Sequence, residues 1–335
     1  MMKVLITGGA GFIGSTIASA CMDQGITPVI LDNLVTGRRE FTEGREFYEG
    51  DMADGPLLDR IFAEHPEIGA TIHCAALIVV PESVSEPLRY YRENVAKTVE
   101  LLEHLQRNGC DRLLFSSSAS IYTPGADFAV DESSELDPLS PYARTKMLME
   151  LAFKDTAEAT PLRVLSLRYF NPIGADPKLR TGLQTPLPSH ALGKLIEARR
   201  AGAPFRITGT DWPTRDGSGI RDYVHVWDLA RAHVAALTHF DQTLPASGSG
   251  CYEVINLGSG TGTTVRELVA AFEAVTGAAQ PVEEAGPRPG DSAGAFTRSG
   301  KAAELLDWRP ELSLEQGIAD TLAWFAHRES VLTPS

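Results

Sequence analysis

The stretch from Val4 to Gly14 reads Val-Leu-Ile-Thr-Gly-Gly-Ala-Gly-Phe-Ile-Gly, and a helical pattern follows it to about Gln24. Its apolar start is typical of a short strand buried in a parallel sheet. Gly8 would allow a tight turn, Gly11 would let the backbone approach a pyrophosphate, and Gly14 would let helix and strand pack closely. The free N–H groups at the helix start would then face the phosphates. The stretch therefore predicts a strand–turn–helix unit that binds a dinucleotide, with a purely structural turn as the alternative.

An acidic residue follows at the tip of the next expected strand, where residues 28–31 lead into Asp32. An acid placed about 20 residues beyond the glycines can bond the adenosine ribose hydroxyls and repel a 2′-phosphate. Arg38 and Arg39 follow soon after and could serve NADP instead. Because Asp32 stands at the strand tip itself, the sequence favours NAD, and we interpret the two arginines as solvated loop charges.

Strands and helices are expected to alternate regularly through the first half of the chain. The expected strands cover residues 4–6, 28–31, 46–51, 70–74, 112–115 and 163–168. A long helix is expected from Val84 to about Asn108, with leucines along one side. This alternation predicts an α/β protein with a doubly wound parallel Rossmann sheet, formed by residues 1–171.

The pattern changes after Pro172, where prolines gather. Beyond it we expect a helix at 192–200, a strand at 205–208, a loose surface loop at 243–250, and a strand at 221–226 that leads into a helix at Trp227. Residues 172–330 are predicted to form a smaller α/β substrate lobe, with some segments returning to the first domain. The last ten residues are expected to fray.

A second glycine-rich stretch, Gly258-Ser259-Gly260-Thr261-Gly262, precedes a helix that is expected to begin near Val265. It resembles another phosphate loop. The simpler interpretation, an ordinary entry into a helix, is favoured because glycine and serine commonly mark such connections.

The net charge of −14 makes a nucleic acid or an anionic membrane a poor partner. The apolar run at the start of the chain is too short for a signal peptide, and no later run reaches membrane-spanning length. The scattered cysteines suit free thiols in a reducing compartment: Cys21, Cys74, Cys110 and Cys251. We therefore expect a cytoplasmic protein.

No metal site is predicted. His73 stands beside Cys74, but no further cluster of histidines or acids completes a ligand set. We expect His73 to be packed in its strand, as we do His225 and His233.

The chemistry is expected from Tyr142 and Lys146, which lie four residues apart on a helix opened by Pro141. A neighbouring ammonium ion would lower the pKa of a tyrosine hydroxyl from about 10. The resulting phenolate could take a proton from an alcohol, and Ser118 at the end of an expected strand could hold that alcohol. A Tyr–Lys pair alone occurs on many solvated helices, so its meaning depends on the motifs around it.

These motifs occur in a fixed order along the chain: Thr7-Gly8-x-x-Gly11-x-x-Gly14, Ser118, Tyr142-x-x-x-Lys146, Arg168-Tyr169-Phe170-Asn171-Pro172 and Arg221-Asp222-Tyr223-Val224-His225-Val226. Together they resemble the extended short-chain dehydrogenase/reductases, and within that family the sugar-nucleotide 4-epimerases. The likeness runs from Lys3 to about Trp308. Its second half is the more specific part, because many relatives share the glycine and tyrosine motifs.

The resemblance implies a tightly held NAD and a UDP-hexose substrate. Tyr142, helped by Ser118, would remove the proton of the sugar 4-hydroxyl while hydride leaves carbon 4. Lys146 would hold the nicotinamide ribose. The 4-keto sugar would then turn over in the pocket and take the hydride back on its opposite face. A homodimer through the helices that include residues 100–108 and 146–158 is also implied.

The same resemblance implies which residues bind the two ligands. NAD would contact Gly8, Gly11, Phe12, Ile13, Gly14, Asp32, Asn33, Asp51, Met52, Ala75, Asn94, Tyr142, Lys146 and Tyr169. The UDP-sugar would contact Ser118, Tyr142, Asn171, Arg221, Arg288 and Asp291. The two arginines would face the diphosphate, which suits an acidic protein.

Other activities in the same superfamily remain alternatives. Dehydratases and decarboxylases carry acids next to the position of Ser118, where this chain has Ala119 and Ser120. A net sugar dehydrogenase or reductase and a non-catalytic dinucleotide-binding protein are the remaining possibilities.

Three departures from the family pattern leave the sugar open, whether UDP-glucose, UDP-galactose, an N-acetylated form or UDP-glucuronate. Ile78 replaces a lysine, Thr185-Pro186 stands where an asparagine is usual, and Ala295 stands near a position where a tyrosine crowds carbon 2 of the sugar.

Overall fold

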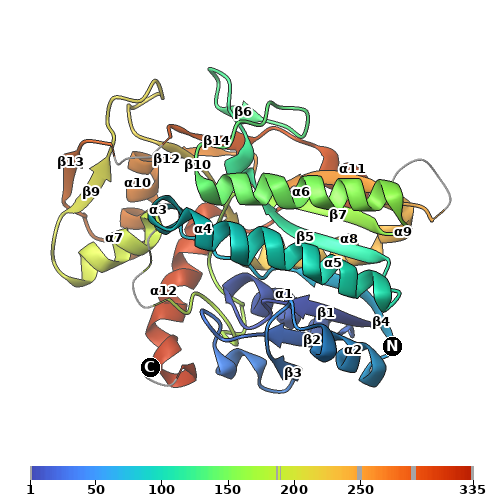
Figure 1. Ribbon diagram of the computed structural model, residues 1–335. Coiled ribbons are helices and arrows are strands. Elements are labelled where there is room, and N and C mark those ends of the chain that lie inside the picture. Colours follow the sequence, from blue (N-terminus) through green and yellow to red (C-terminus); the bar gives the residue numbers. More distant parts are fainter. Residues whose placement is uncertain (1, 186–187, 189, 247–250, 288–291, 333–335) are drawn as a thin grey trace.

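A seven-stranded parallel sheet forms the centre of the protein, in the order β11-β7-β5-β4-β1-β2-β3 (Figure 1). The structure, a computed structural model, describes residues 2–185, 188, 190–246, 251–287 and 292–332. The sheet strands are β1 Lys3–Thr7, β2 Thr27–Asp32, β3 Glu46–Glu49, β4 Ile68–His73, β5 Arg112–Ser118, β7 Arg163–Tyr169 and β11 Tyr252–Leu257. The order reverses direction between β1 and β4, so the predicted doubly wound α/β sheet is confirmed.

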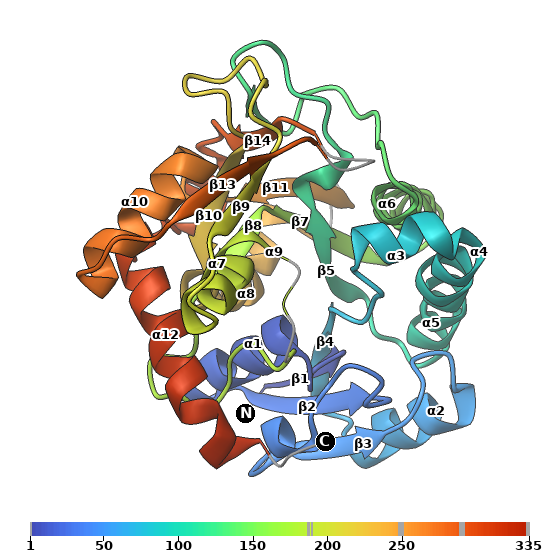
Figure 2. The ribbon, with the colours of Figure 1, turned by 90° about the vertical axis from the view of Figure 1, so that its left-hand side faces the viewer.

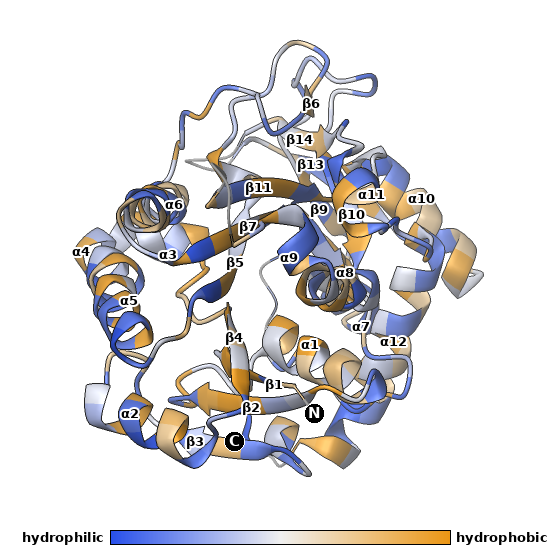
Figure 3. Ribbon diagram, turned by 90° about the vertical axis from the view of Figure 1, so that its right-hand side faces the viewer, coloured by the Kyte–Doolittle hydropathy of each residue, from blue (hydrophilic) through white to orange (hydrophobic). Residues whose placement is uncertain are grey.

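Helices cover both faces of this sheet, as Figure 3 shows. The main ones are α1 Phe12–Asp23 and α8 Val226–Thr238 on one face, with α2 Gly55–Glu64, α5 Lys97–Arg107 and α6 Pro141–Ala159 on the other. Strand β1 feeds both cores in alternation, because Val4 and Ile6 pack with α1 and α8 whereas Leu5 packs with α5 and α6. Within the described part of the chain, no helix has the length and apolarity needed to cross a membrane.

The expected long helix at 84–108 is wrong in its boundaries. The structure has four consecutive pieces instead: α3 Val80–Ser85, α4 Pro87–Tyr90, the π-helical turn η2 Tyr91–Ala96, and α5. The first break falls at Glu86, because a proline cannot donate to the preceding turn and disfavours helical geometry in the residue before it. The wider turn η2 carries the buried Asn94.

Most of the chain beyond β7 forms a second, smaller region with a core of its own (Figures 1 and 2). Its strands are β6 Ala129–Val130, β8 Asn171–Ile173, β9 Phe205–Thr208, β10 Ile220–His225, β12 Gly262–Thr264, β13 Val282–Ala285 and β14 Gly294–Thr297. Its helices are α7 Ala191–Arg200, α10 Val265–Thr276 and α12 Leu314–Val331. Four further short helices lie elsewhere along the described chain: η1 Arg39–Thr42, η3 Ala119–Ile121, α9 Phe240–Thr243 and α11 Lys301–Leu306.

Two segments beyond residue 172, α8 and β11, return to the large sheet, and β11 pairs in parallel with β7. The predicted helices and strands at 192–200, 205–208 and 221–226 are confirmed. The expected fraying of the last ten residues is wrong up to Val331, because α12 buries Trp324 and Phe325 in the core of the smaller region. Of the expected loop at 243–250, residues 247–250 lie outside the described residues.

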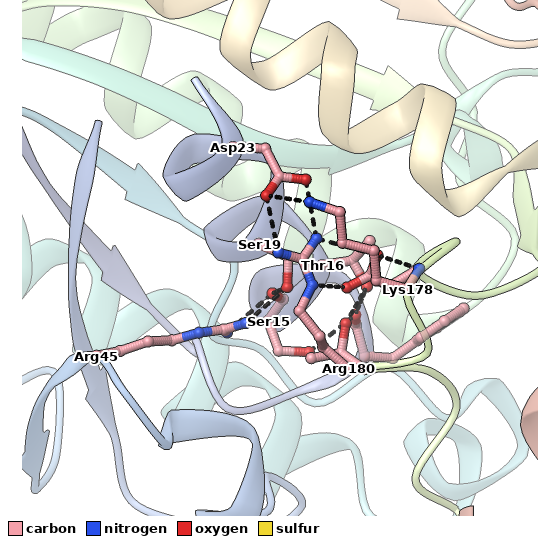
Figure 4. Close-up of polar contacts among 10 residues, drawn as sticks. Ser15, Thr16, Ser19, Asp23, Arg45, Lys178 and Arg180 are labelled. Atoms are coloured by element: carbon pink, nitrogen blue, oxygen red, sulfur yellow. Dashed lines mark hydrogen bonds and ion pairs between the residues drawn. The ribbon is translucent and has the colours of Figure 1, made fainter. Parts of the chain in front are cut away.

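A network of ion pairs joins α1 to the segment that follows β8 (Figure 4). The carboxylate of Asp23 accepts hydrogen bonds from Lys178 Nζ at 2.9 Å and from Arg180 Nη1 at 2.9 Å. Arg180 also pairs with Asp176, whose side chain is fully buried. The chain that leaves β8 is thereby fixed against the helix that begins at the glycine loop.

Candidate active site

The three glycines of the first loop differ in the space around them. Gly8 has a φ of +72°, and a Cβ there would lie 2.6 Å from the backbone nitrogen of Ala75. A Cβ at Gly14 would lie 2.3 Å from the carbonyl oxygen of Gly8. At Gly11 the one contact that a Cβ would make with the described residues is that same oxygen, at 3.4 Å. Gly8 and Gly14 are therefore needed for the fold, whereas Gly11 keeps the outer surface of the loop open.

The N-terminus of α1 has donors available for an anion. Its N-cap is Gly11, and no side chain of the described residues caps it. The first backbone N–H groups of a helix have no partner inside the helix, and they stand at its positive end. The amides of Phe12, Ile13 and Gly14 therefore suit the diphosphate of a dinucleotide.

Asp32 ends β2 and touches the same loop. It is 8% exposed, and its carboxylate accepts hydrogen bonds from Ala10 N at 2.9 Å and from Leu34 N at 2.8 Å. Burial raises the pKa of Asp32, although both backbone donors oppose this. The carboxylate therefore holds the edge of the loop on which the adenosine ribose would rest.

The two arginines that could have favoured NADP are ion-paired. Arg38 Nη2 lies 3.1 Å from Glu40 Oε1, and Arg39 forms a more exposed pair with Glu49. The prediction of solvated loop charges is therefore wrong in part, because Arg38 is largely covered and Arg39 begins the short helix η1, and the role of Asp32 in selecting NAD stays a prediction.

The other expected cofactor residues of β2 and β3 gather near Asp32. Lys97 Nζ donates to Asp51 Oδ2 at 2.6 Å. Burial of the Asp51 carboxylate opposes ionisation, but this ammonium group and the Asn33 side chain lower the pKa of Asp51 overall. Met52 beside it is buried. Their contact with NAD remains a prediction.

Asn94 is fully buried on η2. Its side-chain oxygen accepts from Leu77 N at 2.8 Å, and its nitrogen donates to Leu77 O and to Thr145 Oγ1, both at 3.0 Å. Asn94 therefore ties the loop after β4 to helix α6, and its contact with NAD stays a prediction.

The catalytic candidates meet at the carboxyl end of β5. Helix α6 begins at Pro141, and Ser118 at the end of β5 lies near enough to the Tyr142 hydroxyl to favour its ionised form, while the Ser118 hydroxyl donates to Ser120 Oγ at 2.9 Å. Lys146 Nζ donates to the Ser116 carbonyl oxygen at 2.8 Å and lies 4.7 Å from the centre of the Phe115 ring. The structure thus brings Ser118, Tyr142 and Lys146 together as the sequence predicts.

The expected lowering of the Tyr142 pKa is wrong for this structure. Burial raises the pKa of Tyr142, and the nearby Ser118 side chain offsets this only in part. Burial also lowers the pKa of Lys146 to about 8. The lysine ammonium is bonded to a backbone carbonyl and not to the phenol, so in this arrangement Tyr142 is a neutral phenol at pH 7.

Tyr169 ends β7 directly opposite Ser118 in the register of the sheet. Burial raises the pKa of Tyr169 well above 10, and the nearby Ser116 side chain opposes this only in part. Its ring centroid lies 6.4 Å from that of His233, which is buried as predicted. Tyr169 therefore borders the same edge as the catalytic candidates.

Part of the predicted substrate site can be placed. Asn171 on β8 pairs with Tyr223 of β10, and Arg221 on β10 donates to Ala293 O at 2.8 Å and to Ser292 O at 3.3 Å. Arg288 and Asp291 lie outside the described residues. Arg221 therefore reaches the segment that continues from them.

The second glycine-rich loop is occupied by a carboxylate of the protein itself. Asp222 accepts hydrogen bonds from Ser259 N at 2.7 Å, Gly260 N at 3.2 Å and Thr297 N at 3.1 Å. Helix α10 then begins with a reciprocal cap between Thr264 and Glu267. The interpretation as a helix entry is confirmed, and the phosphate-loop alternative is wrong because Asp222 takes the amides that a phosphate would need.

His73 is packed as predicted. Its Nδ1 lies 2.7 Å from Thr7 Oγ1 and its Nε2 lies 3.1 Å from Thr98 Oγ1, while burial lowers the pKa of His73 to about 3. Among the residues that the structure describes, no three His, Cys, Asp or Glu side chains are grouped as metal ligands would be.

One charged residue beside the site was missed at the sequence level. Glu150 lies one turn beyond Lys146 on α6 and forms a buried ion pair with Arg168. The signal was available, because residues 142, 146 and 150 share one face of a helix.

The fold and this arrangement define the class of the protein. Residues 4–258 match the model of the NAD dependent epimerase/dehydratase family, and the chain belongs to that family. The resemblance inferred from the motifs is confirmed at this level, and NAD is the cofactor of the family.

Individual relatives narrow the comparison further. The chain is 41% identical to a UDP-glucose 4-epimerase of Azospirillum brasilense, over 96% of this chain and 91% of the relative. It superposes on the crystal structure of a UDP-glucose-4-epimerase from Stenotrophomonas maltophila with bound NAD and formylated UDP-arabinopyranose, with a TM-score of 0.92, 34% identity, and coverage of 98% and 99% of the two chains. The UDP-Glc/GlcNAc 4-epimerase from Campylobacter jejuni is similar at a TM-score of 0.80, 32% identity, and coverage of 98% and 100%.

Proposed function

We propose that this protein is an NAD-dependent epimerase that inverts carbon 4 of a UDP-hexose through a 4-keto intermediate. The observation that carries the proposal is the meeting of Ser118, Tyr142 and the buried Lys146 at the carboxyl end of β5. This group stands at the same sheet edge as the glycine loop, where ligands bind in open α/β sheets.

Each of the three residues has a distinct task. With NAD bound, the positive charges of Lys146 and of the nicotinamide would favour the Tyr142 phenolate, which takes the proton of the sugar 4-hydroxyl and later returns it, while Ser118 holds that hydroxyl in line. Lys146 holds the ribose next to the nicotinamide and keeps a positive charge near the phenol. NAD, when bound, accepts the hydride from carbon 4 and gives it back to the other face of the ketone. No net oxidation results, so the cofactor stays in place.

The substrate end of the site rests on the smaller region. Arg221 and Arg288 would pair with the diphosphate, Asn171 would contact the hexose, and Asp291 would contact the uridine ribose. Arg221 already has carbonyl partners on residues 292 and 293, which supports a role in fixing this segment around the ligand. In a protein of net charge −14, local arginines are needed to attract a dianionic substrate.

Ala295 on β14 supports a wide choice of sugar. It packs in a small apolar cluster with Ala119, Tyr122 and Phe170, next to the strand that carries Arg221. The side chain is small, so the site would have room for a 2-acetamido group. We therefore include UDP-N-acetylhexosamines among the proposed substrates, with UDP-glucuronate as the alternative sugar class.

A substrate panel tests the proposal. The purified protein, with no added cofactor, is incubated with UDP-glucose, UDP-N-acetylglucosamine and UDP-glucuronate, and products are identified by NMR. We expect at least one 4-epimer. No epimer from any of them, even with added NAD, would contradict the proposal, and stoichiometric NADH in solution would indicate a dehydrogenase instead.

The Tyr142→Phe variant tests the proposed base. The rate should fall by about two to four orders of magnitude. The NAD content and the melting temperature should stay near those of the wild type, because the ring is kept. Near-normal turnover would remove Tyr142 from the mechanism.

A homodimer through α5 and α6 is part of the proposal. Val99 and Leu151 are 42% and 47% exposed on these helices, and Leu88 on α4 is 76% exposed. Apolar side chains gathered on neighbouring helices suit burial against a second copy. Light scattering should give twice the chain mass for the wild type and a single chain mass for Leu88→Glu combined with Leu151→Glu.

A cytoplasmic location is also proposed. None of the four cysteines forms a disulfide, and burial raises the pKa of Cys21 to about 12, so its thiol is unreactive. This suits a reducing compartment. Recovery of the protein in a membrane or secreted fraction would contradict it.

A further inference from the structure

A buried network of charged and hydroxyl groups lies directly behind the catalytic candidates. Its centre is Glu150, which is 4% exposed on α6. The carboxylate accepts hydrogen bonds from Ser117 Oγ at 2.5 Å, from Arg168 Nε at 2.9 Å and from Tyr252 Oη at 3.2 Å. Three different strands of the large sheet, β5, β7 and β11, therefore meet at one carboxylate.

The guanidinium of Arg168 bonds to two other side chains, Glu150 and Tyr122. Besides its two bonds to Glu150, its Nη1 donates to Tyr122 Oη at 2.8 Å, and its guanidinium lies 4.9 Å from the centre of the Tyr122 ring. The Tyr122 hydroxyl in turn donates to Asn256 Oδ1 at 2.7 Å. The Arg168–Glu150 pair is geometrically rigid, because its two hydrogen bonds fix the plane of the guanidinium relative to the plane of the carboxylate.

Stability alone is a weak reason for this arrangement. Burial of a carboxylate and a guanidinium has a large desolvation cost, and well-packed apolar residues in their place are often as stable. The location of the network suggests another purpose. The run from Ser116 to Ser118 is held by α6 at two successive points, since Lys146 bonds the carbonyl of Ser116 and Glu150 bonds the hydroxyl of Ser117.

We propose that Glu150 is a positioning residue for the epimerase reaction: its carboxylate clamps Ser117 and thereby sets the adjacent catalytic Ser118, and its negative charge, one turn from Lys146, keeps that lysine in its ammonium form. The inference rests on the proposed function. Glu150 contacts neither substrate nor cofactor in this role and acts only through Ser117 and Lys146.

The charges around Lys146 give the direction of the effect. Burial lowers the pKa of Lys146 to about 8, while Cys74 and Glu150 raise it. The other titratable neighbours are a neutral Tyr142 and a neutral His73, whose own pKa burial lowers to about 3.

Arg168 faces Glu150 from β7 with the opposite charge. Removal of the Glu150 charge would leave this guanidinium uncompensated, and both changes disfavour the lysine ammonium.

The test is the pH dependence of kcat for the Glu150→Gln holoenzyme. We expect kcat at the optimum to fall about tenfold or more, and the alkaline limb to move to lower pH by about one unit, because the loss of a nearby opposite charge shifts a pKa by that order. The KM for the UDP-sugar should stay within about twofold, because Glu150 does not touch the substrate. Glu158→Gln, at an exposed position on the same helix, is the matched control and should match the wild type in both measurements.

Ser117→Ala separates the two parts of the proposal and also decides the case if Glu150→Gln does not fold. It should lower kcat while leaving the alkaline limb in place, because the charges remain. Wild-type kcat in Ser117→Ala, or a Glu150→Gln variant that loses only thermal stability with an unchanged limb and kcat, would overturn the inference. A wild-type protein that epimerises no UDP-sugar would overturn the proposed function instead.

Discussion

Two glycine-rich loops each follow a strand of the large sheet and touch a buried aspartate: residues 8–14 lead directly into helix α1, and residues 258–262 lead through the short strand β12 into helix α10. In the first loop, Asp32 bonds only Ala10 N at the margin, and the N-terminus of α1 keeps its amides. In the second, Asp222 bonds both Ser259 N and Gly260 N. The two loops look alike in sequence, but the first is built for an external anion and the second already holds an internal one.

The difference teaches that a glycine pattern alone does not identify a phosphate site. What decides is whether a carboxylate of the protein satisfies the backbone donors. Asp222 comes from the strand beside the second loop, far away in sequence, and only the fold brings them together. Substitutions in the two loops should therefore have separable effects, on stability in one and on NAD in the other.

The largest effect is expected from Asp222→Ala. Its removal leaves the donors of Ser259, Gly260 and Thr297 without their acceptor, which should lower the free energy of unfolding by about 3 kcal/mol. Urea denaturation measures this. The NAD content per folded chain should not change, and Asp222→Asn should be milder because it keeps one acceptor. An unchanged unfolding free energy for Asp222→Ala would contradict the claim that the second loop is held together by this internal carboxylate.

Gly11→Ala should have a smaller effect, and it should weaken NAD binding while leaving the unfolding free energy nearly unchanged. Gly11 has a φ of −85°, which alanine adopts without strain, and its Cβ would point to where the pyrophosphate approaches. NAD should be held about tenfold more weakly, equivalent to about 1.4 kcal/mol. The unfolding free energy of the NAD-free protein should change by no more than about 0.5 kcal/mol. Wild-type NAD retention, measured by cofactor release on dilution, would contradict the predicted use of this loop.

The smallest effect is expected from Gly260→Ala, the matched change in the second loop. Space is available among the residues that the structure describes, since a Cβ would meet Thr297 O alone, at 3.9 Å, but φ is +77°. An L-residue in that conformation costs about 1 kcal/mol. The melting temperature should fall slightly, and NAD retention should equal that of the wild type. Loss of NAD from this variant would mean that the second loop does bind a phosphate.

Local patterns were sufficient to predict most of the fold. The apolar runs that became β1, β2, β4, β5 and β7 have a direct sequence signal, and so do the glycines and the helix opened by Pro141. The break of the predicted 84–108 helix also had a local signal, Pro87, which the apolar pattern obscured. The helical end of the chain was missed because its stability comes from tertiary burial of Trp324.

The sequence was sufficient to predict which residues meet at the candidate site, but not the hydrogen-bond partners and pKa values that they have there. The spacing of Tyr142 and Lys146 places them on one face, yet it does not tell which acceptor the ammonium finds. In the structure that acceptor is the Ser116 carbonyl, and burial dominates the pKa of both groups. The partners of Glu150 come from three strands, so their meeting could be known only from the sheet order.

The central claim is that hydride leaves carbon 4 and returns to it within one closed site. The most direct measurement is the conversion of UDP-glucose deuterated at carbon 4, followed by NMR, with no cofactor added. The account predicts UDP-galactose that keeps the deuterium at carbon 4, with no deuterium lost to water and no NADH released. Solvent hydrogen at carbon 4 of the product, or an inverted product formed by the Tyr142→Phe variant at the wild-type rate, would contradict it.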